Sequence, residues 1–411
     1  MNTEAIGHQN KKETKSLWRN RNFLLIWGGS IISNFGFQLY TIAIPLLIYQ
    51  ISQSALAMST MRMIEFFPNI FIGMIAGVLV DRYNRKKMMQ WASFIQAMSM
   101  TFLVYLLIVD QVEIWHLYIL GFALSASGYT FGNAQHAVLP EIVVKEQLIN
   151  ANAKFSFAQT IIGMIGPGVA GFIIAVFSFT YSFAIYTVCI FLMFLCMYFL
   201  SYHPHTSNTK EGSTIWIDMK EGIDELFQNK ILLIPTITVL WVNFASSLII
   251  GILIFYVVDQ LGSSETEVGL MYSISAIGGL IGASIVGRLR KKFGRGEIYT
   301  FTLLIDVIGI ICIIAATSWW LIGISLAIRT FAITISNIVY FTIRQEFTPN
   351  HLLGRVSGTS SMLMKITLPL GLMISGLWAE WLPIPILFIA SAAIIFVLFI
   401  ILLFHSFRQL D

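Results

Sequence analysis

The chain has 411 residues, of which 57% are hydrophobic and only 11% are charged, and its net charge is +4. Soluble domains carry roughly 25% charged residues, and a surface with far fewer would expose apolar patches that aggregate. The composition therefore excludes an ordinary soluble protein and predicts an integral membrane protein. Because Cys189, Cys196 and Cys312 all lie in hydrophobic stretches, no framework of extracellular disulfides is expected.

Twelve hydrophobic segments are long enough to cross a bilayer, which takes about 20 residues of helix. Residues 1–21 precede them and have neither the apolar core nor the cleavage site of a signal peptide. The first six predicted helices are 22–50, 55–80, 88–109, 114–138, 152–177 and 180–202. The next six are 231–257, 266–287, 298–317, 319–343, 356–377 and 383–405. Ser318 alone separates the ninth helix from the tenth.

The distribution of Lys and Arg predicts the side of the membrane on which each loop lies. An even number of spans puts both termini on one side. If that side is the cytoplasm, 21 of the 25 basic residues lie in cytoplasmic segments and the other four within spans. The acidic residues of the external loops are then Asp110, Glu113, Asp259, Glu265, Glu267 and Glu380. We therefore expect a multi-pass plasma-membrane protein with both termini in the cytoplasm.

The two halves of the chain repeat short phrases in the same order, at an offset of 205–209 residues. The basic loop after the second helix likewise corresponds to the loop after the eighth. The matched positions are 17–21 with 226–230, 34–35 with 243–244, and Gly166 and Gly171 with Gly371 and Gly376. The repeat predicts an all-α membrane fold of two six-helix bundles related by a pseudo-two-fold axis. Many secondary transporters have this construction, with the substrate site near the midplane between the bundles.

The expected division of the chain follows from this repeat. It consists of a cytoplasmic tail (1–21), a first bundle (22–202), a cytoplasmic linker (203–230), a second bundle (231–405) and a second cytoplasmic tail (406–411). Apolar residues at 216, 219, 223 and 226 of the linker form a helical stripe. We expect an amphipathic helix there, lying along the cytoplasmic membrane surface and connecting the bundles.

A charged cluster follows the second predicted helix and comprises Gly77, Asp81, Arg82, Arg85 and Lys86. One interpretation is an ordinary basic cytoplasmic turn. The other is a cytoplasmic gate, because Gly77 permits close helix approach and an acid beside fixed cations can pair in two alternative packings. The copy at 287–292 keeps the cations but has no acid, so a second gate would be weaker or different.

The fifth predicted helix concentrates glycine around a proline, at Gly163, Gly166, Pro167, Gly168 and Gly171. Proline removes a backbone hydrogen bond and bends a helix, whereas glycines open a groove for a partner helix. Tight packing alone would explain this composition. The alternative is a functional motif, which a family resemblance described below would support.

The residues of the charged cluster, together with Leu79, spell G-x-L-x-D-R-x-x-R-K and resemble the signature of the major facilitator superfamily. In that family the acid is thought to lock the closed cytoplasmic side against helix 11. The stretches that resemble macrolide-efflux and enterobactin-export proteins are 139–141, 147–153, 219–222, 229–230 and 353–356. The glycines around Pro167 partly match the antiporter motif, which ends in Gly-Pro-x-x-Gly-Gly. The resemblance implies a bacterial twelve-span drug/proton antiporter that functions as a monomer.

Helix two carries Arg62, Glu65 and Asn69 on one face near mid-depth. A charge at the bilayer centre costs roughly 2.5–3.5 kcal/mol on insertion scales, so such residues are retained when paired, solvated or functional. Arg62 and Glu65 can neutralise each other as a purely structural pair. Alternatively, Glu65 exchanges a proton as the cavity opens to each side, because burial favours the neutral acid and the neighbouring Arg favours the carboxylate.

Other polar residues within spans are further candidates for the cavity or the proton path. A structural hydrogen bond is favoured for Asp306, because the third helix of each bundle is usually peripheral in the superfamily. Arg329 and Lys365 can attract an anionic group or hold Asp306 or Glu346. Helices one and seven line the central cavity in the superfamily, and their amides are either ligands or interhelical contacts: Asn34, Gln38 and Asn243.

No Walker-type phosphate loop occurs in the sequence, so an ion gradient rather than ATP is the expected energy source. One charge crossing about 150 mV releases roughly 3.5 kcal/mol, enough for a gradient of a few hundredfold. We therefore expect a transporter, not an enzyme, that exports an amphiphilic small molecule in exchange for protons. Its partners would be substrate, protons and the lipid bilayer, without nucleic acid, cofactor or metal.

Two alternatives to this hypothesis remain. The first is a dedicated siderophore or metabolite exporter, since Arg329 and Lys365 suit an anionic chelate whereas Glu65 suits a cationic drug. The second is a membrane enzyme or sensor built on a transporter-like scaffold. Against it, the sequence contains no cluster of His, Cys or acids with metal-ligand spacing and no soluble segment long enough for a sensing domain.

Overall fold

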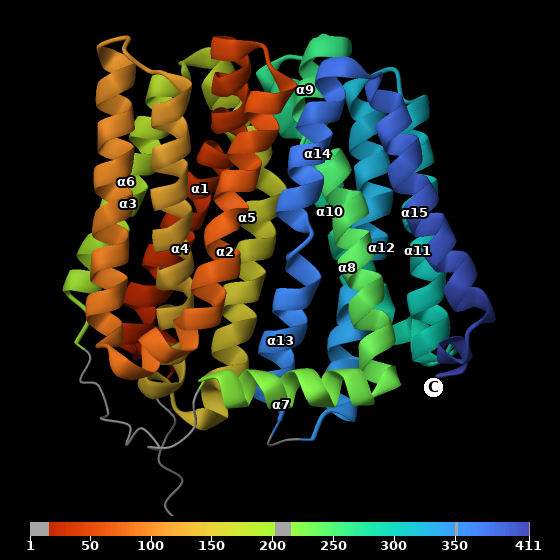
Figure 1. Cartoon of the computed structure of the whole chain (residues 1–411). Coiled ribbons are helices and arrows are strands. Elements are labelled where there is room, and N and C mark those ends of the chain that lie inside the picture. Colours follow the sequence, from red (N-terminus) through yellow and green to blue (C-terminus); the bar gives the residue numbers. More distant parts are fainter. Residues whose placement is uncertain (1–15, 202–214, 350–351, 411) are drawn as a thin grey trace, which may run out of the picture.

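The computed structural model of the chain describes residues 16–201, 215–349 and 352–410, with the backbone alone at 70–82 and 215–219. Every regular element in these ranges is helical. The helices stand side by side as two bundles of six membrane-spanning units each (Figure 1). Ten of these units are long and apolar enough to be recognised as spans from the described residues alone. The predicted all-α fold of two six-helix bundles is therefore confirmed.

The helices of the first bundle match the predicted segments within a few residues. They are α1 (Arg21–Ser52), α2 (Ala55–Arg82), α3 (Arg85–Ile108), α4 (Ile114–Ile142), α5 (Leu148–Val176) and α6 (Phe179–Tyr198). Within this bundle α1 packs against α5 and α6, and α4 packs against α2 and α3.

The second bundle follows the same plan, but two of its spans are divided. Its helices are α8 (Lys230–Ile250), α9 (Leu253–Phe255), α10 (Glu265–Leu289), α11 (Arg295–Ala315), α12 (Trp319–Phe347), α13 (Leu353–Lys365), α14 (Leu368–Trp381) and α15 (Ile384–Phe404). The seventh span comprises α8, α9 and a π-helical turn at Tyr256–Gln260, and the eleventh comprises α13 and α14. Short 3-10 turns lie at Leu17–Arg19, Lys145–Gln147 and Ser406–Gln409.

One of the repeated phrases, at 17–21 and 226–230, contains a helix cap that occurs in both halves. The side chain of Asn20 accepts a hydrogen bond from the backbone N–H of Phe23 at the start of α1, and Asn229 does the same for Ile231 at the start of α8. Each cap also donates its amide to the last turn of the fourth helix of its own half. The distances from Asn Nδ2 to the carbonyl oxygen are 2.7 Å at Ile142 and 3.3 Å at Phe347.

The break in the eleventh span was not expected from the sequence. Pro369 lacks the N–H that would bond the carbonyl of Lys365, and its ring crowds that carbonyl, so the helix is weakened at this turn and here it breaks. A side chain of α8 satisfies the interrupted backbone, because Asn243 donates to the carbonyl of Met364 at 2.8 Å. The hydroxyl of Thr367, at the break, donates in turn to the carbonyl of Leu240 in α8 at 3.0 Å. The eleventh span therefore consists of two helices, not one.

The seventh span is also interrupted, at Gly251 and Ile252. At this point α8 approaches α14 so closely that a Cβ on Gly251 would stand 2.2 Å from the hydroxyl of Ser375. The chain then makes the π-helical turn before α10 begins. Such an irregular turn occurs where close packing between helices is incompatible with the regular hydrogen bonds of an α-helix.

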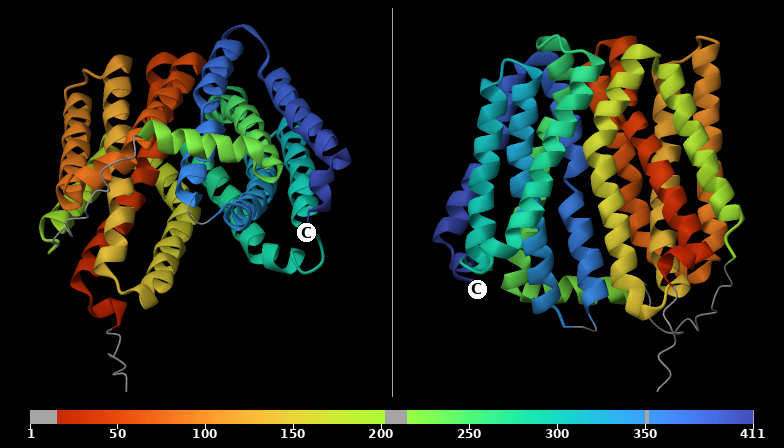
Figure 2. Two further views of the ribbon diagram at one scale, coloured as in Figure 1. Left: turned by 60° about the horizontal axis from the view of Figure 1, so that its bottom comes forward. Right: turned by 180° about the vertical axis from the view of Figure 1, so that it is seen from behind.

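The linker contains the amphipathic helix that the apolar stripe predicts, α7 (Ile215–Gln228). It crosses one end of the molecule and packs against α13 and α8 (Figure 2). Leu226 is fully buried there, whereas Ile223 is 37% exposed. Gly222 lies directly against the backbone of Arg355, and the side chains of Glu221 and Arg355 form an ion pair. The helix is thus docked on the second bundle as well as joining the two halves.

Candidate functional site

The two ends of the molecule are called here the α7 end and the α9 end (Figure 1). Between these ends, α2 carries the predicted pair of Arg62 and Glu65, in its half nearer the α9 end. Their side chains form an ion pair with an Nη1–Oε2 distance of 3.1 Å and are only 17% and 11% exposed. Arg62 also donates to the carbonyl of Thr41 at 2.9 Å. That carbonyl is available because Pro45, one turn later in α1, has no N–H to bond it.

Only one oxygen of Glu65 is held by Arg62. Its Oε1 atom is buried and lies near the buried Tyr40 hydroxyl, and neither atom makes a hydrogen bond of regular geometry among the described residues. An unpaired buried carboxylate oxygen costs free energy unless it gains a proton or a water molecule.

Lys365 joins the two bundles at the same depth. Its Nζ atom donates to Asn69 Oδ1 of α2 at 3.2 Å and to the Tyr129 hydroxyl of α4 at 3.1 Å. Both partners are neutral, and no described acidic side chain lies within ion-pair distance of Lys365. Because Asn69 follows Glu65 by four residues, the ion pair and the Lys365 cluster occupy one face of α2. We call Arg62, Glu65, Asn69, Tyr129 and Lys365 the central polar set.

The three candidate amides divide between packing and backbone support. Asn243 supports the broken eleventh span, as described above. Gln38 lies against Gly166 of α5, where a Cβ would stand 2.5 Å from its Cγ atom. Asn34 lies half-buried on α1, one turn before Gln38.

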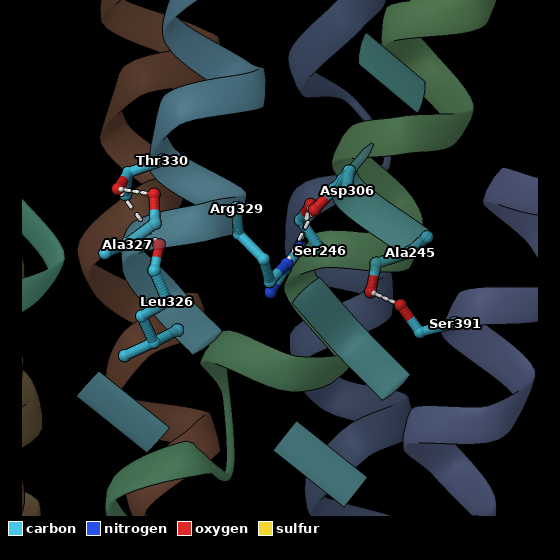
Figure 3. Close-up of polar contacts among 8 residues, drawn as sticks. All are labelled: Ala245, Ser246, Asp306, Leu326, Ala327, Arg329, Thr330 and Ser391. Carbon is cyan, nitrogen blue, oxygen red and sulfur yellow. Dashed lines mark hydrogen bonds and ion pairs between the residues drawn. The ribbon is translucent and has the colours of Figure 1, made fainter. Parts of the chain in front are cut away.

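Asp306 and Arg329 bind each other inside the second bundle (Figure 3). The distance from Arg329 Nε to Asp306 Oδ1 is 2.7 Å, and both residues are at most 3% exposed. Arg329 also donates from Nη2 to Ser246 of α8 at 3.1 Å. Gly309 makes room for this arginine, since a Cβ there would stand 2.5 Å from Arg329 Cγ. The pair thus joins α11, α12 and α8, and lies apart from the central polar set.

Part of the charged cluster after α2 can be placed. Gly77, Asp81 and Arg82 belong to α2, but their side chains lie outside the described residues. Arg85 starts α3 and forms an ion pair with Glu141 at the end of α4, with an Nη1–Oε1 distance of 2.5 Å. The half-buried Lys86 follows it.

The ion pair of Arg85 has a counterpart in the second half. Arg295 starts α11 and pairs with Glu346 near the end of α12, with an Nη2–Oε2 distance of 2.6 Å. The basic residue of the second half that corresponds to Arg85 is therefore Arg295, outside the expected copy at 287–292. Glu346 is held by this arginine and by neither Arg329 nor Lys365.

The glycines of α5 form a contact between the bundles. The Pro167 carbonyl and the Gly171 backbone lie against Gly269 of α10, where a Cβ would stand 2.3 Å from the Pro167 oxygen. The N–H of Gly168 donates to the Ser273 hydroxyl at 3.0 Å. In contrast, no other segment comes within 4 Å of a Cβ built on Gly163. The stretch from Pro167 to Gly171 is thus an interhelical seam.

Polar contacts between the bundles lie at mid-depth or toward the α9 end in the part of the chain that the structure describes. Near the α9 end, Tyr49 donates to Asp259 at 3.1 Å and Ser54 donates to Glu380 at 2.8 Å. Three ion pairs of the α7 end, among the residues that the structure describes, each join parts of one bundle or of its docked linker: Arg85–Glu141, Arg295–Glu346 and Arg355–Glu221. The described contacts therefore close the molecule at its α9 end.

Sequence reasoning missed the tyrosines around the central polar set. Tyr129 binds Lys365, Tyr40 lies beside Glu65, and Tyr272 of α10 lies near Arg62. A tyrosine in a hydrophobic span gives no sign of what its hydroxyl contacts. The faces of α4 and α10 that turn toward α2 are known only once the bundles are assembled.

Comparison with known proteins adds independent evidence. The family profile described as Major Facilitator Superfamily matches residues 26–367 and 236–409. Macrolide efflux protein A of Streptococcus pyogenes is 24% identical over 405 residues, which cover 95% of this chain and 97% of that protein. Enterobactin exporter EntS of Shigella boydii serotype 18 is 24% identical over 294 residues, covering 70% and 69%. The crystal structure of the nucleoside transporter NupG superposes with a TM-score of 0.80 at 11% identity, covering 93% of this chain and 99% of that one.

Proposed function

Because the chain belongs to the Major Facilitator Superfamily, a family of membrane transporters, we propose that it exports an amphiphilic small molecule in exchange for protons. The substrate would be a drug or macrolide-like compound, as the resemblance to macrolide efflux protein A suggests. Transport would proceed by alternating access, in which the two bundles rock about a central site. The chain would work as a monomer in the plasma membrane, with the α7 end and both termini in the cytoplasm.

One observation carries this proposal most directly. The central polar set spans both bundles at mid-depth, through the contacts of Lys365 with Asn69 and Tyr129. Rocking of the bundles must break these contacts. Glu65 lies one turn away with a buried, unpartnered oxygen, so the same movement would change its surroundings and its affinity for a proton. In this proposal Glu65 couples proton transfer to the opening of the cavity.

Replacement of Glu65 tests the coupling. We expect Glu65→Gln to abolish uphill, proton-driven transport of a radiolabelled macrolide in proteoliposomes, while downhill exchange of the same macrolide continues. Glu146→Gln, in the exposed turn between α4 and α5, is the matched control and should transport normally. Uphill transport by Glu65→Gln at the wild-type rate would remove this residue from the coupling role.

We assign the cytoplasmic gate to Gly77, Asp81, Arg82, Arg85 and Lys86. The pairing of Arg85 with Glu141 holds the start of α3 against the end of α4, and thus fixes the loop that would carry the gate. Asp81→Asn should then slow turnover while substrate affinity changes little. Turnover equal to wild type would contradict the gate.

A dedicated exporter of an anionic siderophore or metabolite is the second candidate, and Lys365 favours it. Arg62 and Glu65 neutralise each other, so Lys365 leaves the central polar set with one excess positive charge. A buried cation is costly when unpaired, and an anionic ligand would offset that cost. EntS, one of the similar proteins, is an enterobactin exporter.

The charge of Lys365 distinguishes the two candidates. If the substrate is anionic, Lys365→Gln should abolish export of a catecholate siderophore from cells that make one, and Lys365→Arg should retain it. If the substrate is a neutral or cationic drug, Lys365→Gln should leave drug export largely intact. Drug-resistance and siderophore-release assays on the same variants separate these outcomes.

A further inference from the structure

The first bundle has a groove on its outer face, between α3 and α4, with a volume of about 610 Å3. This is within the range of ligand pockets, roughly 300–1,000 Å3. Of the longer helices, α3 packs against α4 and α6 and makes no comparable contact with the second bundle. The groove thus faces away from the cavity between the bundles and toward the surrounding lipid (Figure 1).

Side-chain size explains why a groove exists here. Ala92, Ala123, Ala126 and Ser127 line it, and their short side chains leave space between the two helix backbones. Large residues form its walls, among them Trp91, which is 64% exposed. A floor of small residues between large walls gives a channel along the helices, with room for a linear apolar chain.

One end of the groove is polar. Asn84 and Lys87 line it at the start of α3, and Lys87 is exposed. In the described part of the chain no acidic side chain forms an ion pair with Lys87. The other lining residues toward mid-depth are mainly apolar, and include Ile95 and Phe122. The groove thus has a cation at the membrane surface and an apolar channel leading inward.

Its length matches one leaflet of a bilayer. From Asn84 to Ile95 the helix rises about 16 Å, at 1.5 Å per residue. Half of the hydrocarbon core is about 15 Å. The polar end lies toward the α7 end, which the distribution of Lys and Arg places in the cytoplasm, and the cytoplasmic leaflet carries anionic lipids.

We propose that this groove binds one anionic phospholipid of the cytoplasmic leaflet, with its phosphate at Lys87 and an acyl chain along α3 and α4 as far as Phe122. A lipid satisfies both ends of the groove at once, because its headgroup is charged and its tail is linear and apolar. The site is separate from the central polar set and does not depend on the identity of the transported substrate.

Native mass spectrometry of the full-length protein in detergent tests this site by counting bound phosphatidylglycerol, with phosphatidylethanolamine as the zwitterionic comparison. The wild type should retain one phosphatidylglycerol at ratios where phosphatidylethanolamine does not bind. Ala126→Leu fills the floor and should abolish this binding. Ala393→Leu adds the same bulk at an exposed position of α15 and should preserve it.

Variants of exposed residues guard against misfolding as an explanation. Lys87→Gln should weaken phosphatidylglycerol binding about fivefold, whereas Lys291→Gln, an exposed lysine of the corresponding loop, should not. Trp91→Ala, which removes a wall, should also release the lipid. Equal binding by Ala126→Leu and Ala393→Leu, or by Lys87→Gln and Lys291→Gln, would overturn the proposal.

Discussion

At the scale of single residues, charges within the membrane fall into two kinds. Asp306 and Arg329 are almost fully buried and hold each other, and Ser246 adds a third contact. Glu65 is likewise held by Arg62, and Glu65 and Asp306 each keep one buried oxygen without a hydrogen bond among the described residues. Lys365, in contrast, has only the neutral partners Asn69 and Tyr129. The ion pairs neutralise their own charges, whereas no described acidic side chain neutralises the charge of Lys365.

The sequence predicted one of these pairings and gave the other as one of two alternatives. Arg62 and Glu65 stand three residues apart in a helix, so their contact follows from helix geometry alone. Asp306 and Arg329 are separated by a loop, and their contact depends on how α11 packs against α12. For Arg329 the sequence left open both an anionic ligand and Asp306, and the structure places it on Asp306.

Removing one member of this buried pair should be costly. We expect Asp306→Ala to lower the free energy of unfolding by about 3–5 kcal/mol, because it leaves the charge of Arg329 buried and unpaired. Reversible unfolding in mixed micelles measures the loss. The double variant Asp306→Leu with Arg329→Met should recover most of it, since no charge then remains buried. A double variant that loses the sum of both single effects would contradict this account.

At the scale of elements, the same helix caps and ion pairs occur in both halves. Asn20 and Asn229 cap the first helix of each bundle and bind the end of its fourth helix. Two Arg–Glu pairs hold the start of the third helix against the end of the fourth. These repeats show why short matched phrases of sequence were informative: they are the contacts that define each bundle.

The matched glycines extend the symmetry to the seam between the bundles. Gly171 of the fifth span lies against Glu265 and Thr266, at the start of the eighth span. Gly376 of the eleventh span lies in the same way against Leu56 and Ser59, at the start of the second. Each seam thus pairs a glycine of one half with the second helix of the other.

A side chain at this seam should prevent closure of the α9 end. In Gly171→Val the Cβ would lie only 2.4 Å from the carbonyl oxygen of Glu265. This distance is too short for two non-bonded atoms, so the bundles must separate there. We expect thiol labelling of a cysteine at Thr266 from the α9 side to rise. Gly163→Val, in the open part of the same helix, is the matched control. If both variants label equally, the seam does not close this end.

Elements were predictable from the sequence to within a few residues, except where a span is divided. The length of a hydrophobic segment locates a span, but it does not show whether a backbone hydrogen bond inside the span is missing. The eleventh span carries Pro369 in an otherwise helical stretch, and other spans continue through their prolines. The outcome here depends on two contacts with α8, one from Asn243 to the carbonyl of Met364 and one from Thr367 to that of Leu240, and both form only after α8 has packed beside the eleventh span.

At the scale of the whole molecule, the number of helices and their division into bundles followed from composition, length and repeat. The conformational state did not follow from these properties of the sequence. Whether the bundles meet at the α9 end or the α7 end depends on a difference of a few kcal/mol between two packings of the same helices. No pattern of hydropathy encodes that difference.

The orientation and the state can be tested together. In a variant without native cysteines, Gly358→Cys on α13 should react with a membrane-impermeant maleimide added to the α7 face, because no segment among the described residues comes within 4 Å of its Cβ position. Inside-out vesicles should be labelled and right-side-out vesicles should not. The reverse result would place the α7 end outside the cell.

The division of the eleventh span has a mechanical consequence. Its α14 half belongs to the seam with α2, whereas its α13 half carries the docked linker helix. Lys365 is the last residue before the joint between them. A swing of α13 together with α7 would therefore turn the lysine away from Asn69 and Tyr129 without unzipping α14 from α2. The break in the eleventh span thus lies beside its central charge, and the connector between the two halves is docked on the α13 side of that break.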